Sequence, residues 1–340
     1  MKAWVVRELG HHRDVLRLED TPDPAMQPGS ARIRVEAAAL NFLDLLVCQG
    51  QYQEKPPLPF TPGVEVCGVV EEVAPGSTFQ VGDRVIALPQ LPHGGLAEQV
   101  VVPLAQVHRV PQGASPAEAA AMFITYHTAY YALHRLARLQ PGEVLLVHAG
   151  AGGVGSAAIQ LGKAAGARVI ATAGGPEKVE TCRQLGADEA VDYRSGDFVE
   201  VVKAFTSGRG ADVIFDPVGG DVFDASRRCI AFEGRLLVIG FASGRIPQAP
   251  MNHALVKNYS LVGVHWGLFH RLYPDAVREM HEELIRLYEA GRIRPLVRHV
   301  YPFEDVIPAM DALGGRQTVG KVIVSVSRRD ADAWPEREGR

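Results

Sequence analysis

The pattern of hydrophobic and polar positions changes character near residue 115. Before that point, short alternating or β-branched stretches stand between proline and glycine turns, at residues 31–37, 63–73 and 82–88. Alternation with a period of two is typical of half-buried strands. The first third of the chain therefore predicts a compact, mostly β domain.

A different alternation begins at Ser115. Ser115, Pro116 and Glu118 have the spacing of a capping box with proline at the first helical position, which predicts a helix start. From there to about residue 263, helical segments separate most of the apolar stretches. Those stretches are residues 144–148, 168–171, 189–192, 212–215, 236–239 and 261–264. Repeated βαβ units predict an α/β domain with a doubly wound parallel sheet of the Rossmann type.

After Pro274 the pattern predicts a long amphipathic helix over residues 276–290, a strand at 297–301, a short helix from Phe303 and a strand at 321–326. These elements fit as a completion of the first domain. We therefore expect one domain over residues 1–122 and 268–327 and a second, dinucleotide-binding domain over 123–267. Residues 328–340 carry four basic and four acidic residues, and we expect a solvated, disordered tail.

Composition excludes several classes of function. The chain has 340 residues, of which 47% are hydrophobic, and a net charge of −4 without a basic block. This balance argues against a nucleic-acid partner, and no apolar run approaches the ~20 residues that cross a bilayer. Charge interrupts the N-terminal residues too early for a secretory signal, and the four cysteines form no C-x-x-C pair. We expect a reduced, cytoplasmic protein without a membrane partner.

A glycine-rich turn follows the first strand of the second domain. Gly150, Gly152 and Gly155 form G-x-G-x-x-G, with Gly153 and Val154 between them, immediately before a helix. The first glycine permits the tight turn, the second lets the backbone approach a pyrophosphate, and the third brings helix and strand together. The turn predicts a dinucleotide site at the helix N-terminus.

The end of the second strand predicts the kind of dinucleotide. No carboxylate stands at residues 171–175, where one would bind the ribose 2′-hydroxyl of NADH. Gly174 leaves room for a 2′-phosphate and Lys178 supplies positive charge, while Tyr193 and Arg194 could cover the same group. These residues favour NADPH over NADH.

Several motifs in a fixed order give the chain a family resemblance. They are the segments 41–44, 50–52, 62–68, 82–85, 128–131, the glycine-rich turn, 216–220 and 234–241. Over residues 1–326 the chain resembles the medium-chain dehydrogenase/reductase superfamily, and within it the quinone oxidoreductase (zeta-crystallin-like) branch. The resemblance implies a GroES-like catalytic domain, a Rossmann domain, and a cleft between them that holds the nicotinamide.

The chain departs from the zinc-dependent members of that superfamily. Their catalytic zinc is held by an early cysteine and by a histidine, and the matching positions here look like Asn41 and Val64. Valine has no lone pair, and an amide is a poor zinc ligand beside thiolate or imidazole. We therefore expect no zinc. Without a Lewis acid, hydride addition to an electron-poor acceptor is easier than alcohol oxidation.

The resemblance also implies roles for single residues. Asn41 and Tyr52 should lie near the nicotinamide and the acceptor, Thr128 should contact the nicotinamide, and Phe241 with Ser243 should flank the cofactor. Tyr52 is either a proton donor or an aromatic wall of the pocket.

The favoured function is NADPH:quinone reduction, with a quinone or other conjugated carbonyl compound as the small-molecule substrate. One alternative is reduction of a 2-enoyl thioester or enone, with Tyr52 as the proton donor. Some quinone reductases have a tyrosine where this chain has Leu46, and related enoyl reductases carry a tyrosine in a Gly-x-Tyr setting similar to that of Tyr52. A further alternative is an NADPH-binding protein with a structural or RNA-binding role.

In relatives the last strand of the Rossmann sheet, here near residues 260–264, pairs with its copy, so a homodimer through that edge is expected.

Overall fold

The structure is a computed structural model that describes residues 1–326. Two compact units make up the chain: Met1–Phe123 together with the segment that begins at Pro295, and Ile124–Arg294. The first junction lies close to the expected one. The second lies after Arg294 rather than at residue 268. The predicted tail at 328–340 falls outside the described residues.

The first unit is built on a seven-stranded sheet. Its path runs β14-β15-β3-β4-β5-β7, with β6 paired to β3, and a separate pair joins β1 to β2. The strands are β1 (Lys2–Val6), β2 (Leu16–Asp20), β3 (Ser30–Leu40), β4 (Val66–Val73), β5 (Arg84–Ala87), β6 (Gln99–Pro103), β7 (Val107–Arg109), β14 (Val297–Pro302) and β15 (Lys321–Ser325). Its short helices are α1 (His12–Val15), α2 (Phe42–Cys48), η1 (Leu104–Gln106), η3 (Phe303–Asp305) and α11 (Val306–Gly314).

The register of the central strand of this unit positions one corner of the sheet. Strand β3 pairs antiparallel with β15, where Leu40 faces Val322, and antiparallel with β4, where Ala38 faces Val66. The end of β3 therefore meets the beginnings of β4 and β15. Residues far apart in sequence, such as Asn41 and Lys321, are brought together there.

The second unit contains a six-stranded parallel sheet in the order β10-β9-β8-β11-β12-β13. This is the doubly wound order that the alternation predicted. The strands are β8 (Val144–Val147), β9 (Arg168–Ala173), β10 (Glu189–Asp192), β11 (Ala211–Asp216), β12 (Ile230–Val238) and β13 (Ser260–Gly263). All six predicted strands are present, with ends that differ by a few residues.

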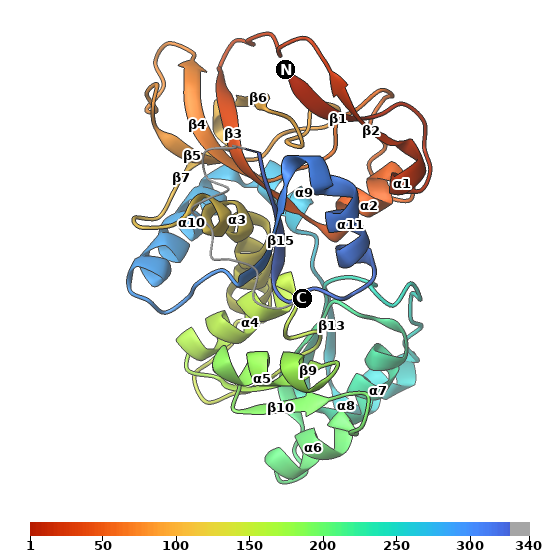
Figure 1. Cartoon of the computed structure of the whole chain (residues 1–340). Helices are drawn as coiled ribbons and strands as arrows, with labels where there is room; N and C mark the ends of the chain where they lie inside the picture. Colours follow the sequence, from red (N-terminus) through yellow and green to blue (C-terminus); the bar gives the residue numbers. More distant parts are fainter. Residues whose placement is uncertain (327–340) are drawn as a thin grey trace. The chain divides into compact units, whose positions relative to one another are not determined.

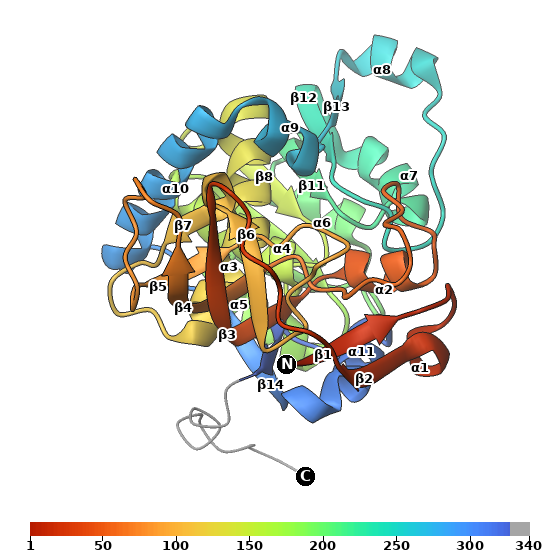
Figure 2. The ribbon, with the colours of Figure 1, turned by 90° about the horizontal axis from the view of Figure 1, so that it is seen from above.

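Helices lie along both faces of this sheet (Figure 1). Those in contact with its strands are α4 (Gly153–Ala164), α5 (Pro176–Gln184), α6 (Phe198–Phe205), α7 (Gly220–Cys229) and α8 (Met251–Lys257). The unit also contains α9 (Trp266–Leu272) and α10 (Pro274–Glu289), which follow β13 along the chain. Figure 2 shows α8 at the outer margin of the unit, close to β12 and β13. Helix α3 (Pro116–Tyr130) continues into the π-helical turn η2 (Tyr131–Leu136). Its predicted capping box is present, since Ser115 and Glu118 exchange backbone-to-side-chain hydrogen bonds of 3.0 and 3.3 Å.

Aromatic packing explains why the second unit extends past residue 268. The ring of His127 lies 5.2 Å from that of Trp266, and Tyr131 stacks on Phe269 at 4.2 Å. These contacts fasten α9 to α3 and η2. Helix α10 follows, with an apolar face that repeats every three or four residues. That pattern identifies a buried face but not the unit against which the face packs.

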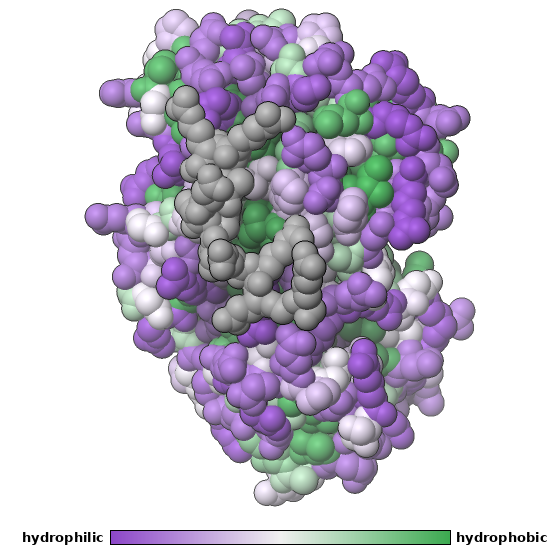
Figure 3. Space-filling view, viewed as in Figure 1, coloured by the Kyte–Doolittle hydropathy of each residue, from purple (hydrophilic) through white to green (hydrophobic). Residues whose placement is uncertain are grey.

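The face of the molecule seen in Figure 3 is mainly hydrophilic, and apolar side chains form small groups on it. Within residues 1–326, no helix has both the length and the apolar character needed to cross a membrane.

Candidate functional site

The glycine-rich turn connects β8 to the N-terminus of α4, and close contacts require two of its glycines. A Cβ atom on Gly155 would lie 2.2 Å from the carbonyl oxygen of Ala149, and one on Gly150 would lie 2.8 Å from Sγ of Cys182. Neither position can carry a side chain without moving the turn. Gly152 is the N-cap of α4, so the first N–H groups of this helix face the turn, the arrangement that binds a pyrophosphate in such folds.

His148, the residue after β8, connects this turn to β9 and α7 through hydrogen bonds. Its Nδ1 lies 2.9 Å from Oγ1 of Thr172 on β9, and its Nε2 lies 2.8 Å from Oγ of Ser226 on α7. Complete burial lowers the pKa of His148 to about 3, so the ring is neutral at physiological pH. It joins three elements and has no exposed face with which to act on a substrate.

Arg194 and Tyr193 lie at the end of β9, beside Gly174. A Cβ atom on Gly174 would lie 2.5 Å from the hydroxyl of Tyr193 and 3.1 Å from Nε of Arg194. Lys178 stands in the first turn of α5, and burial, followed by the charge of Arg194, lowers its pKa. The structure thus brings Gly174, Tyr193 and Arg194 together, and Lys178 follows Gly174 by four residues.

A carboxylate near this corner is already committed to the backbone. Oδ1 of Asp192 accepts hydrogen bonds from the backbone N–H groups of Gly175 and Arg194, each at 3.0 Å. These bonds, first that from Gly175, lower the pKa of Asp192. Asp192 therefore fixes the turn that carries Arg194, while β9 itself ends without a carboxylate at Ala173.

Phe241 and Ser243 lie on a loop at the carboxyl ends of β11 and β12. The backbone N–H of Ser243 donates to the carbonyl of Val218 at 2.9 Å, and a Cβ on Gly219 would lie 2.9 Å from the Phe241 ring. Phe241 is 39% exposed. The loop lies at the same edge of the parallel sheet as the glycine-rich turn, the edge at which such sheets bind ligands. Thr128 lies on α3 and is nearly buried.

A buried polar network surrounds Asn41 in the first unit. Nζ of Lys321 donates to Oδ1 of Asn41 at 2.7 Å and to the carbonyl of Leu40 at 3.0 Å, and it forms an ion pair with Glu65 at 3.2 Å. Nδ2 of Asn41 donates to the carbonyl of Ala39 at 3.2 Å and to Glu65 at 3.3 Å. Lys321 is 5% exposed and Glu65 is fully buried.

These contacts fix the direction in which the Asn41 amide points. Lysine can only donate, so the amide oxygen must face Lys321, and both amide hydrogens are used by protein acceptors. The side chain of Asn41 also forms the capping-box contact with the backbone N–H of Asp44 at the start of α2. Asn41 therefore presents an oriented amide oxygen and has no free amide hydrogen to donate.

Asp44 holds the loops on either side of this network. Its carboxylate accepts hydrogen bonds from the backbone N–H groups of Asn41 at 2.8 Å and Gly63 at 3.0 Å. Burial raises the pKa of Asp44 to about 6, although the two backbone bonds oppose this effect. Asp44 joins the start of α2 to the segment that carries Glu65.

Tyr52 takes a different position in the same unit. It is partly buried and packs against the hydrophobic core cluster that includes Leu45 and Phe60. This packing is compatible with an aromatic side chain that lines the pocket, and it does not test whether the Tyr52 hydroxyl donates a proton.

The residues at the corner of the sheet do not fit a metal ion. Val64 offers no ligand atom, the Asn41 oxygen accepts from Lys321, and the Glu65 carboxylate is paired with the same ammonium. A cation at this point would face the positive charge of Lys321. Across residues 1–326, no group of three or more His, Cys, Asp or Glu side chains could hold a metal.

Two family profiles match the chain, one in each half. Residues 27–112 match the alcohol dehydrogenase GroES-like domain, and residues 153–283 match the family described as zinc-binding dehydrogenase. The chain is 40% identical over 311 residues to quinone oxidoreductase-like protein 2 of Bos taurus, a match that covers 91% of this chain and 88% of the relative. It also matches Escherichia coli quinone oxidoreductase complexed with NADPH, at a TM-score of 0.89 and 27% identity over 96% of this chain and 100% of that one.

The chain belongs to the medium-chain dehydrogenase/reductase superfamily, in its zinc-free quinone oxidoreductase branch. A second solved member, the quinone oxidoreductase of Thermus thermophilus, has a structure in complex with NADPH. It is 38% identical, with a TM-score of 0.82 over 96% of this chain and 100% of that one. The cofactor of this medium-chain reductase is NADPH, as the end of β9 predicted, and the protein is an oxidoreductase with a small-molecule substrate.

Sequence reasoning missed three residues of the Asn41 network, namely Asp44, Glu65 and Lys321. Glu65 stands between Val64 and Val66, and Lys321 opens an apolar strand. A charged residue inside an apolar stretch was the signal available, because such residues are rarely buried unless they are paired.

Proposed function

We propose that this protein reduces quinones with NADPH and without zinc. The observation that carries the proposal is Lys321, whose ammonium bonds to Asn41 at 2.7 Å in the place where a zinc-dependent relative would need ligands. The names of its curated relatives and the NADPH complexes of solved relatives support the same reaction class.

For the cofactor, we assign the pyrophosphate to the turn formed by Gly150, Gly152, Gly153, Val154 and Gly155. The 2′-phosphate is assigned to Gly174, Lys178, Tyr193 and Arg194. Lys178 and Arg194 offer charge-assisted hydrogen bonds, and the lack of a side chain on Gly174 lets Tyr193 and Arg194 approach the end of β9. Phe241, Ser243 and Thr128 are assigned to the nicotinamide half.

At the acceptor end, Asn41 acts through its amide oxygen, whose direction Lys321 fixes. NADPH supplies the hydride when bound. The donors that suit this oxygen are a ribose hydroxyl of the cofactor and the hydroxyl that forms as a quinone is reduced. Lys321 and Glu65 are positioning residues, because they hold the amide in this direction.

Quinone chemistry suits a site of this kind. A quinone that receives a hydride and a proton becomes a hydroquinone, and its ring carries the developing charge without a Lewis acid. In the alternative reaction, an enone or 2-enoyl thioester takes hydride at its β-carbon and needs a proton donor at the α-carbon. The packing of Tyr52 against the core supports a wall more than a mobile acid.

A panel of acceptors with NADPH tests the proposal. Turnover of 1,4-benzoquinone or 9,10-phenanthrenequinone that exceeds turnover of crotonyl thioesters is expected. Turnover of crotonyl thioesters with neither quinone reduced would contradict quinone reduction and favour the alternative. NADPH binding without turnover of any electrophilic carbonyl compound would favour a structural role.

We also propose a homodimer through β13. This strand lies at the edge of the six-stranded sheet, and its side chains are largely exposed, with Leu261 at 38%. An open edge with apolar side chains is stabilised by pairing with a second copy.

The four cysteines are buried and unpaired and the net charge is −4, which supports a cytoplasmic protein without a nucleic-acid or membrane partner.

A further inference from the structure

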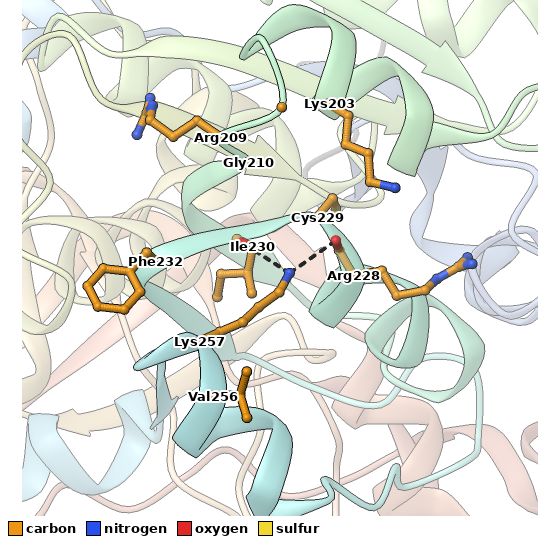
Figure 4. Close-up of a pocket in the computed structure, with 10 residues that line it drawn as sticks. Lys203, Arg209, Gly210, Arg228, Cys229, Ile230, Phe232, Val256 and Lys257 are labelled. Carbon is orange, nitrogen blue, oxygen red and sulfur yellow. Dashed lines mark hydrogen bonds between the residues drawn. The ribbon is translucent and has the colours of Figure 1, made fainter.

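A basic cavity of about 200 Å³ lies at the amino end of strands β11 and β12. Five segments line it: α6, the loop before β11, the end of α7, the start of β12, and α8. Their side chains are drawn in Figure 4. The lining residues are Lys203, Gly208, Arg209, Gly210, Arg228, Cys229, Ile230, Phe232, Val256 and Lys257.

This cavity is distinct from the dinucleotide site. Strands β8 and β11 are parallel and in register, so their amino ends share one edge of the sheet and the glycine-rich turn follows the other. A strand of six residues spans roughly 20 Å. The cavity is therefore separated from the cofactor turn by about the length of β11.

Four cations and no carboxylate line the cavity. Arg209 is paired with Asp212 and Lys203 with Glu200, the latter at 3.1 Å. Within the described part of the chain, neither Lys257 nor Arg228 forms an ion pair with a carboxylate. The cavity therefore keeps a positive charge that nothing in its own walls neutralises.

In Figure 4 the ammonium of Lys257 points at the backbone of Arg228 and Ile230, and the side chains of Lys203 and Arg228 extend on one side of it. The Lys257 ammonium donates to the carbonyl oxygens of Arg227, Arg228 and Ile230 at 3.3, 3.2 and 3.4 Å. These distances exceed the roughly 2.8 Å usual for an ammonium and an anionic oxygen. Burial, and the charge of Lys203, lower the pKa of Lys257. The three hydrogen bonds of the Lys257 ammonium are therefore long, and an anionic oxygen would be a stronger acceptor than these carbonyl groups.

The backbone around the cavity is constrained. A Cβ atom on Gly210 would lie 2.6 Å from the carbonyl of Cys229 and 2.8 Å from the N atom of Ala231. Ala211 pairs with Ile230, whereas Val213 pairs with Arg235, so the segment between the two β12 partners bulges from the sheet. This bulge carries Phe232, which is 65% exposed.

Apolar side chains stand beside the cations. Phe232 and Val256, the latter 77% exposed, both line the cavity. Pockets for whole drug-sized ligands usually measure roughly 300–1,000 Å³, so about 200 Å³ suits a single anionic group. The rest of such a ligand would lie outside, against the exposed ring.

We propose that this cavity binds a phosphate monoester whose apolar or aromatic portion lies on Phe232 and Val256. Lys257 holds the phosphate, with Lys203 and Arg228 beside it. The same chemistry occurs in a soluble aromatic phosphate and in the head group of phosphatidate. The experiment separates these two sources.

Calorimetric titration of the native protein, with NADPH saturating its own site, provides the test. Phenyl phosphate and inorganic phosphate are the soluble probes, and phosphatidylcholine vesicles with and without phosphatidate are the membrane probe. The variants are Lys257→Met, Arg228→Met and Phe232→Ala. Lys55→Met, at an exposed lysine of the other unit, is the charge-matched control.

Phenyl phosphate should bind the parent protein and the Lys55→Met control with equal affinity. It should bind Lys257→Met about tenfold more weakly, because this variant loses a charge-assisted hydrogen bond. Arg228→Met should also weaken it. Phe232→Ala should weaken phenyl phosphate but leave inorganic phosphate unchanged. Binding to phosphatidate vesicles alone, lost in the same variants, would support the proposal with a lipid source.

Two results would overturn the proposal. One is the absence of binding by every phosphate probe at low salt. The other is binding that Lys257→Met and Arg228→Met leave unchanged. Arg228 is exposed, so its variant remains informative even if Lys257→Met folds poorly.

Discussion

Lys178 and Arg194 are the side chains on which coenzyme choice should depend. Arg194 and the hydroxyl of Tyr193 lie beside Gly174, and Lys178 stands in the first turn of α5, which follows it. The change Lys178→Glu replaces a phosphate-binding cation with a repelling anion. Because hydrogen bonds to charged groups contribute about 1.5–3 kcal/mol, NADPH affinity should fall roughly tenfold to a hundredfold, while NADH affinity changes little.

Titration of each coenzyme by fluorescence measures this change. Lys55→Glu serves as the control for net charge, because Lys55 is exposed in the first unit. Equal affinities for NADPH and NADH in the parent protein would show that Gly174 and Lys178 do not form the 2′-phosphate site.

Lys321 tests the direction of the Asn41 amide. Lys321→Met leaves Glu65 buried without its partner, which should cost about 3–5 kcal/mol of stability. The double variant Lys321→Met, Glu65→Gln removes the uncompensated charge and should recover much of the melting temperature. It should still show a kcat/KM for quinone roughly tenfold below the parent, because the amide is free to turn.

Lys321→Arg retains a donor toward Asn41 and should keep more activity than the double variant. If the double variant recovered both stability and full kcat/KM, Lys321 would have a structural role only. Steady-state kinetics and thermal unfolding of the three variants give the answer.

Strands β8 and β9 and helix α7 meet at His148, and this junction predicts a pH effect on stability. The pKa of His148 is about 3 in the folded chain, against about 6.5 when unfolded. Between these values the unfolded chain binds a proton that the folded chain does not. The contribution of this residue is therefore present above pH 6.5 and is lost as pH falls toward 3.

His148→Gln removes this titration. The stability of the parent relative to the variant should fall by about 1.4 kcal/mol per pH unit as pH decreases below about 6.5. Asp44, with a pKa raised to about 6, acts in the opposite direction between pH 6 and its ordinary value, so the difference between parent and variant is the quantity to measure. A difference that does not vary with pH would contradict the buried, neutral ring.

The strands and helices of the second unit were readable from the sequence because each carries a local signal. Glycine and proline turns bound the β-branched segments, and the capping box at Ser115 marks a helix. The amphipathic pattern of α10 predicted that helix but not its unit. Packing of Trp266 and Phe269 against α3 and η2 decided the unit, and no local pattern reports such a contact.

The Asn41 network shows the same limit. Asn41 and Lys321 meet because β3 pairs with β15, and they are 280 residues apart in sequence. The glycine-rich turn and the corner at Gly174, by contrast, are each formed within a short stretch of chain. The sequence therefore predicted the two cofactor motifs, each formed by a local stretch of chain. It predicted only Asn41 of the network that the pairing of β3 with β15 assembles.

For the assembled molecule, the edge strand β13 is the dimer interface that we propose. Leu261→Lys places a charge on the exposed edge and should convert a dimer into a monomer at micromolar concentration, since charged edge residues oppose strand pairing. Val81→Lys changes an exposed valine of the first unit and should leave the dimer intact. Sedimentation velocity separates the two forms, and a monomeric parent protein would contradict the proposed interface.

The most direct test of zinc-free quinone reduction is NADPH oxidation by 1,4-benzoquinone before and after treatment with a strong chelator. Because Lys321 stands beside Asn41 and Val64 offers no ligand, kcat/KM should be unchanged by the chelator, with one NADPH consumed per hydroquinone formed. Loss of turnover on chelation, restored by added zinc, would contradict the account, as would the absence of any quinone turnover.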